Sequence, residues 1–195
     1  EAISKNERSI VRLRTGLADG SQTVAGIGLV VSADGTIVVD SKNYSSTVSY
    51  DIVFHDGKTY PIGQVYIDKD NGLAFLKTNV PKNDNSKYVF YSALLGNSDN
   101  LKIGQTLVAV NGRESNAVSI GRVRQLTFAE DKETVTSIDS DITVLRDYAG
   151  SPALNLSGEV VGVQSGLLEG ETTYSYTPIN RVKAAMVRAL QELAK

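Results

Sequence analysis

Short runs rich in Val, Ile, Thr and Tyr alternate with polar turns along most of the chain. Segments 24–32 and 72–78 have the length and the apolar content of buried strands. Asp56-Gly57 separates two further runs in the way that a hairpin turn does. Strands this short, at this spacing, predict an all-β architecture, either barrels or a sandwich.

The pattern changes at two places. Segment 79–92 is polar and contains proline, which predicts a connection between two β halves. From Asn180 onward apolar residues recur at helical spacing, with Asn180 as the expected N-cap and Pro178 just outside the helix. The expected boundaries are therefore 1–82, 83–177 and 178–195. The apolar positions of the predicted helix are Val182, Ala185, Met186, Ala189, Leu190 and Leu193.

Composition excludes several classes of function. The chain has 195 residues, 41% of them hydrophobic, which suffices for the core of one domain or of two small ones. Lys and Arg number 20 against 22 Asp and Glu, so a basic surplus for binding nucleic acid is lacking. With Cys 0 and His 1, the sequence offers little to a transition metal and rules out a thiolate nucleophile. We expect no cofactor, no metal and no nucleic-acid partner.

Several motifs in a fixed order carry a resemblance to a known family. They are "LGNSDNLKIGQTLVAVNG" at 95–112, "AVSIGRV" at 117–123, "SYTPINRV" at 175–182, and Gly26-Ile27-Gly28 followed by a hairpin. Together they resemble the trypsin-like serine proteases of the bacterial high-temperature-requirement (Deg) family. The resemblance covers nearly the whole chain. It implies two six-stranded chymotrypsin-like barrels followed by a C-terminal α-helix.

The same resemblance places unexpected residues at the catalytic positions. Asn43 stands where the family has its histidine, and Gly72 stands where the family has its aspartate. Within "DYAGSP", Ala149 falls on the family's serine and Asp147 on the glycine whose N–H helps to form the oxyanion hole. The resemblance therefore implies a degenerate branch of the family, with all three triad positions and one oxyanion position changed.

Acyl transfer requires a hydroxyl or thiol nucleophile, a base beside it and donors for the oxyanion. Because an amide cannot act as a base near neutral pH, we predict a pseudoprotease, catalytically inactive, that binds or scaffolds a peptide or protein. Two alternatives stay open. One is an active serine endopeptidase with a relocated nucleophile, Ser151, beside Lys42; the other is a purely structural oligomerisation module.

Four residues are predicted to line the former cleft: Tyr44, Tyr148, Gly150 and Ser151. The two tyrosines adjoin Asn43 and Ala149 in sequence, and they either present a stacking surface or plug the cleft. His55, the single histidine, is interpreted as a surface residue. Segment 68–72 is interpreted as a polar turn rather than a calcium loop, because position 79 is Asn where that loop needs Glu.

The resemblance further implies an extracytoplasmic location, periplasmic or at the cell surface. It also implies a membrane anchor upstream of this chain, a peptide-binding PDZ domain after the last helix, and assembly into a trimer. These are expectations by family analogy.

Overall fold

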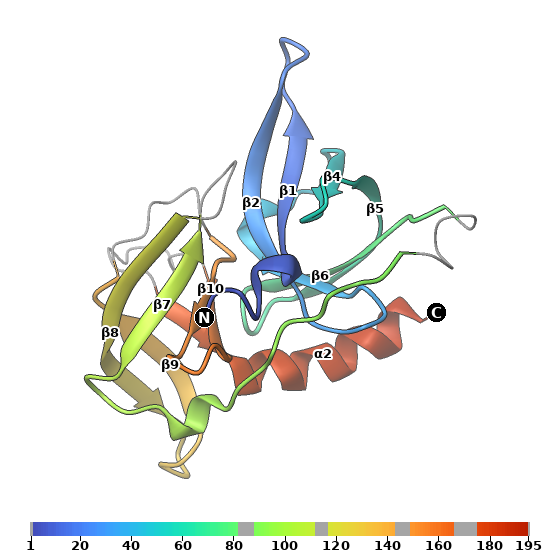
Figure 1. Cartoon of the computed structure of the whole chain (residues 1–195). Helices are drawn as coiled ribbons and strands as arrows, with labels where there is room; N and C mark the ends of the chain where they lie inside the picture. Colours follow the sequence, from blue (N-terminus) through green and yellow to red (C-terminus); the bar gives the residue numbers. More distant parts are fainter. Residues whose placement is uncertain (1, 82–87, 112–116, 143–148, 166–174, 195) are drawn as a thin grey trace.

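The computed structural model describes residues 2–81, 88–111, 117–142, 149–165 and 175–194. Within them the chain forms two closed six-stranded antiparallel barrels followed by helix α2 (Figure 1). This confirms the predicted two-barrel fold and the predicted helix. No described helix has the length and apolar character to cross a membrane.

The first barrel contains the strands β1 (Ile10–Gly16), β2 (Gln22–Val30), β3 (Ile37–Asp40), β4 (Tyr50–Val53), β5 (Thr59–Asp68) and β6 (Leu73–Thr78). Their order around the barrel is β1-β2-β3-β6-β5-β4. Asp56-Gly57 forms the turn between β4 and β5, as predicted, and Gly57 has a φ of 79° that suits glycine. Two short 3-10 helices, η1 (Glu7–Ser9) and η2 (Ser41–Asn43), precede β1 and follow β3.

The second barrel contains β7 (Thr106–Asn111), β8 (Ala117–Phe128), β9 (Val135–Ser140), β10 (Pro152–Leu154), β11 (Val160–Ser165) and β12 (Ser175–Pro178). Their order is β10-β11-β12-β9-β8-β7. The 3-10 helix η3 (Ser98–Asn100) precedes β7, and β12 leads directly into α2 (Ile179–Leu193).

The start of α2 differs from the prediction. Pro178 is the N-cap, and Asn180 lies inside the first turn. The side-chain amide of Asn180 donates hydrogen bonds of 2.7 Å to Asn97 Oδ1 and to Asp99 Oδ2. Asn180 therefore does not cap the helix but ties it to η3, an interaction that local helix rules do not include.

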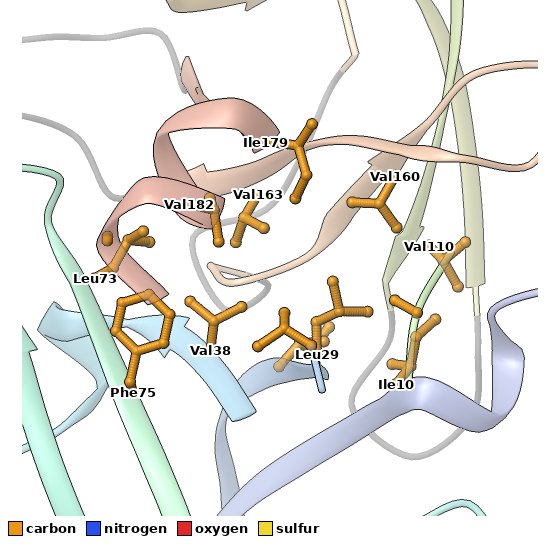
Figure 2. Packing of buried hydrophobic residues seen from close by; sticks show 14 of the residues in the cluster. Ile10, Leu29, Val38, Leu73, Phe75, Val110, Val160, Val163, Ile179 and Val182 are labelled. Atoms are coloured by element: carbon orange, nitrogen blue, oxygen red, sulfur yellow. The ribbon is translucent and has the colours of Figure 1, made fainter. Parts of the chain in front are cut away.

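A shared hydrophobic cluster joins the barrels and the helix (Figure 2). Leu29, Val38 and Phe75 contribute from the first barrel, Val163 from the second, and Val182 from α2; all five are buried. Of the predicted apolar helix positions, Val182, Ala185, Ala189 and Leu193 are buried, while Met186 is partly buried against the cluster. At about 1.5–3 kcal/mol for each large apolar side chain, this burial holds the two barrels in a fixed relation.

Polar contacts reinforce the junction. Asn6, fully buried before β1, donates from Nδ2 to the Gly158 carbonyl at 2.5 Å and accepts at Oδ1 from Leu94 N–H at 2.7 Å. At the end of β5, the buried carboxylate of Asp68 pairs with Arg188 of α2 at 3.3 Å. The N-terminal segment and α2 therefore both bind one barrel to the other.

Candidate site between the barrels

The end of β3 positions Asn43. Because β3 pairs with β6 so that Asp40 lies opposite Leu73, the chain leaving β3 runs beside Gly72. Asp40 Oδ1 accepts a hydrogen bond of 2.8 Å from Lys42 N–H and caps η2. The Ser41 N–H donates to the Gly72 carbonyl at 3.0 Å. These two bonds fix η2, and with it the side chain of Asn43 at its end.

Ala149 lies against Asn43, although 106 residues separate them. The Ala149 carbonyl accepts two hydrogen bonds, one from Asn43 Nδ2 at 2.9 Å and one from Ile27 N–H at 3.2 Å. Ala149 itself is 5% exposed. A side-chain amide and the backbone carbonyl of a buried alanine therefore meet at the centre of this site.

Two glycines make this approach possible. A Cβ on Gly26 would lie 2.2 Å from Asn43 Nδ2, so only hydrogen fits there. Gly150 has a φ of 93°, and a Cβ on it would lie 2.0 Å from the Ile27 carbonyl oxygen. The Gly150 N–H donates to the Gln164 carbonyl at 2.9 Å, and this bond attaches the end of the loop to β11. Gly150 is therefore required for the loop to reach the first barrel, and Gly26 leaves the space that the Asn43 amide occupies.

The remaining predicted residues have different surroundings. Tyr44 is half-buried and packs on Tyr50, with ring centroids 5.6 Å apart, at the margin of the first barrel's core. Gly150 and Ser151 are buried, and Ser151 is 0% exposed, which argues against direct contact with a partner. Asp147 and Tyr148 lie outside the described residues. His55 is exposed, as predicted, and its ring centroid lies 5.0 Å from that of Tyr91, with the two rings nearly perpendicular.

A cavity of about 230 Å³ adjoins this site. Gly72 and Lys42 line it from the first barrel, Tyr176 from the second, and Arg181 from α2. Sequence reasoning missed Tyr176 and Arg181, because neither belongs to a catalytic motif. Burial raises the pKa of the Tyr176 phenol, so this hydroxyl stays protonated.

Comparison with known proteins agrees with this architecture. The family model described as a trypsin-like peptidase domain matches residues 24–163. The chain belongs to the trypsin-like peptidases of the Deg family. A protein of Chlamydia pneumoniae named as a probable periplasmic serine endoprotease, DegP-like, is 30% identical over 161 residues, which is 78% of this chain and 31% of that protein. A protein of the same name from Brucella suis is 28% identical over 148 residues, 73% of this chain and 27% of its own length.

Solved structures show the same fold. The crystal structure of Deg5 has a TM-score of 0.74 at 21% identity, covering 94% of this chain and 89% of that one. The HtrA-type protease AlgW, solved with a decapeptide, has a TM-score of 0.75 at 14% identity and covers 98% and 66% of the two chains. This chain thus spans less than a third of the length of the curated Deg-family relatives named above. The assignment of Asn43, Gly72 and Ala149 to the triad positions stays a prediction.

Proposed function

We propose that this domain is a catalytically inactive member of the Deg family, a pseudoprotease that binds an extended peptide or a partner protein. The observation that carries the proposal is the hydrogen bond from Asn43 Nδ2 to the Ala149 carbonyl. A protease needs a base and a nucleophile in contact, whereas here the contact is between an amide and the backbone of an alanine.

The chemistry of the neighbouring residues agrees with inactivity. The Ala149 methyl group cannot attack a carbonyl, and the Asn43 amide is already engaged as a donor. Gly72 has no side chain to orient a base. Loss of a complete triad lowers turnover by about 10⁶-fold in a related mechanism.

A relocated nucleophile is poorly supported. Ser151 is 0% exposed, so its hydroxyl does not reach the surface where a substrate would lie. Its backbone carbonyl accepts the Gln164 N–H at 2.9 Å, which fixes the residue in the second barrel. Lys42, its proposed partner, is exposed to solvent.

Hydrolysis of unfolded casein tests the loss of activity. We expect the purified chain and the Ser151→Ala variant to release no more peptide than buffer does over a long incubation. Cleavage by the parent but not by the variant would establish a relocated nucleophile and refute the proposal.

A strand edge beside the site offers a surface for an extended peptide. β3 pairs with β2 at Gly28, Leu29 and Val30, while β1 pairs with β2 along its whole length. Within the described residues, segment 22–26 of β2 therefore pairs with β1 on one side and with no strand on the other. This segment ends at Gly26, against Asn43. Unpaired backbone groups on a strand edge are the usual basis for peptide addition to a sheet.

Two proline variants test this edge. Adjacent residues of an antiparallel strand direct their N–H groups to opposite sides. One of the variants Thr23→Pro and Val24→Pro therefore removes an inward N–H, directed toward β1, and the other removes an outward N–H, directed toward the free edge. We expect the inward variant to lower the melting temperature. The outward variant should keep the melting temperature and lose binding of fluorescein-labelled casein, measured by anisotropy. If both variants bind like the parent, the edge is not the binding surface.

The relatives from Chlamydia and Brucella are named periplasmic, which supports an extracytoplasmic location for this chain. A membrane tether in the full-length protein and assembly into a trimer are proposed by family analogy alone. If the chain binds no casein yet sediments as a trimer, the structural oligomerisation module becomes the better description.

A further inference from the structure

Ser41 and Lys42 of η2 line the cavity that adjoins the site. Its volume of about 230 Å³ far exceeds the ~10–15 Å³ that a single water requires. Its wall combines the first barrel, the second barrel and α2, and the residues that line it are mainly polar. A small hydrophilic ligand therefore fits there together with several waters.

Basic side chains outnumber acidic ones on the cavity wall. Lys42, Lys69 and Arg181 carry positive charge, whereas Asp40 and Asp70 carry negative charge. Asp40 is buried, and its Oδ1 accepts the Lys42 N–H at the start of η2. The excess of one positive charge, spread over three basic groups, favours an anion in this space.

Within the described residues, no ion pair engages the three basic groups. In the part of the chain that the structure describes, ion pairs join Lys77 to Asp34 and Arg188 to Asp68, and neither pair includes a basic residue of this wall. Arg181 is held in place, since its Nε donates to Asn71 Oδ1 at 2.7 Å. Such a fixed guanidinium is suited to binding an oxyanion.

The wall also supplies neutral donors. Ser165 and Ser175 line the cavity with hydroxyl-bearing side chains, which can donate hydrogen bonds to an anion. Thr177 also lines it, but its hydroxyl already donates to the Asn71 carbonyl at 3.3 Å. The Tyr176 hydroxyl has almost no accessible surface and therefore does not face the cavity.

We propose that this cavity binds a small oxyanion of the carboxylate or phosphate class, held by Lys42, Lys69 and Arg181. Because Lys42 and Lys69 belong to the first barrel and Arg181 to α2, the bound anion links the two and stabilises their junction. This inference does not depend on the proposed function, since it requires neither the loss of hydrolysis nor the binding of a peptide.

Titration with inorganic phosphate and with succinate tests the site, with chloride keeping the ionic strength constant. We expect at least one of these anions to bind with a Kd of about 1 mM or tighter in calorimetry and to raise the melting temperature. The anion that binds more tightly distinguishes the phosphate class from the carboxylate class.

Charge variants give effects of opposite sign. The double variant Lys42→Gln/Lys69→Gln should weaken binding about tenfold, and Asp70→Asn should strengthen it about two- to threefold. Lys102→Gln, an exposed lysine of the second barrel that does not line the cavity, is the matched control and should leave the Kd unchanged.

Three results would overturn the proposal. The first is that neither anion raises the melting temperature at about 10 mM. The second is that Lys102→Gln weakens binding as much as the double variant does. The third is that Asp70→Asn weakens binding while the double variant strengthens it. The last result would mean that the cavity selects cations.

Discussion

The side-chain amide of Asn43 donates a 2.9 Å hydrogen bond to the backbone carbonyl of Ala149, from one barrel to the other. The same carbonyl accepts the Ile27 N–H at 3.2 Å. These two bonds lie at the centre of the site and hold the barrels together. A residue in this role stabilises the fold, and its removal is expected to change stability rather than turnover.

Restoring a serine at position 149 should not restore hydrolysis. The new hydroxyl of Ala149→Ser would lie beside Asn43, whose amide cannot accept its proton. We expect no casein cleavage above buffer and no labelling by a fluorophosphonate probe. Labelling of the variant but not of the parent would reveal a base that the described residues do not include.

The contact between Gly26 and Asn43 gives a double-variant test. Gly26→Ala places its Cβ 2.2 Å from Asn43 Nδ2, and we expect it to lower the free energy of unfolding by about 1–3 kcal/mol. Asn43→Ala alone should cost about 1 kcal/mol, the usual value for one hydrogen bond.

Urea unfolding of the double variant completes the cycle. Because the Asn43 amide is the group that clashes, Gly26→Ala/Asn43→Ala should cost less than the sum of the single variants. Strict additivity would show that position 26 tolerates a methyl group without disturbing Asn43.

Much of this fold could be predicted from the sequence because its signals are local. Short apolar runs between turns gave the strands, and helical spacing after Pro178 gave α2. The meeting of Asn43 and Ala149 has no local signal, and only the family resemblance brought these two positions together. The first turn of α2 was predicted wrongly because the Asn180 side chain bonds to Asn97 and Asp99, which lie more than 80 residues earlier.

The cavity could not be predicted at all. Its wall residues come from β3, η2, the turn before β6, β9, β11, β12 and α2, which share no motif and no periodicity. Closure of two barrels against one helix creates that space, so its position depends on tertiary packing.

Gly150 should be among the least replaceable residues. Its φ of 93° and the 2.0 Å approach of the Ile27 carbonyl both oppose a side chain. Gly150→Ala should cost about 3 kcal/mol or more in urea unfolding. Gly57→Ala is the matched control, because Gly57 has a similar φ of 79° but nothing within 4 Å of the added Cβ. It should cost about 1 kcal/mol; equal losses would mean that strain alone, without the clash, accounts for both.

Asn6 should stabilise the junction between the two barrels more than its exposed neighbour Lys5 does. Asn6→Ala removes the bonds to the Gly158 carbonyl and the Leu94 N–H and leaves both backbone groups without that partner. A loss of roughly 2–4 kcal/mol is expected in urea unfolding. Lys5→Ala removes one exposed bond, from Lys5 Nζ to the Ser157 carbonyl, and should cost under about 0.5 kcal/mol. A loss for Lys5→Ala as large as that for Asn6→Ala would refute this ranking.

Asp34 should make part of the stability depend on pH. Burial opposes its charge, but hydrogen bonds from Lys77, Ser32 and Thr36 outweigh that effect and hold the pKa of Asp34 well below its ordinary 3.8. A pKa lowered by folding adds stability above the unfolded value, and that stability is lost as the pH falls below it.

The comparison of the parent with Asp34→Asn isolates this contribution. The ion pair between Asp34 and Lys77 is 2.7 Å long and the Asp34 side chain is 51% exposed, so we expect the variant to be less stable by only about 0.5–1 kcal/mol at pH 7. At pH 3 the difference should shrink, because Asp34 of the unfolded parent then binds a proton whereas Asp34 of the folded parent stays charged. Urea unfolding at both pH values measures it, and a difference that grows as the pH falls would show that the carboxylate is not stabilised in the folded chain.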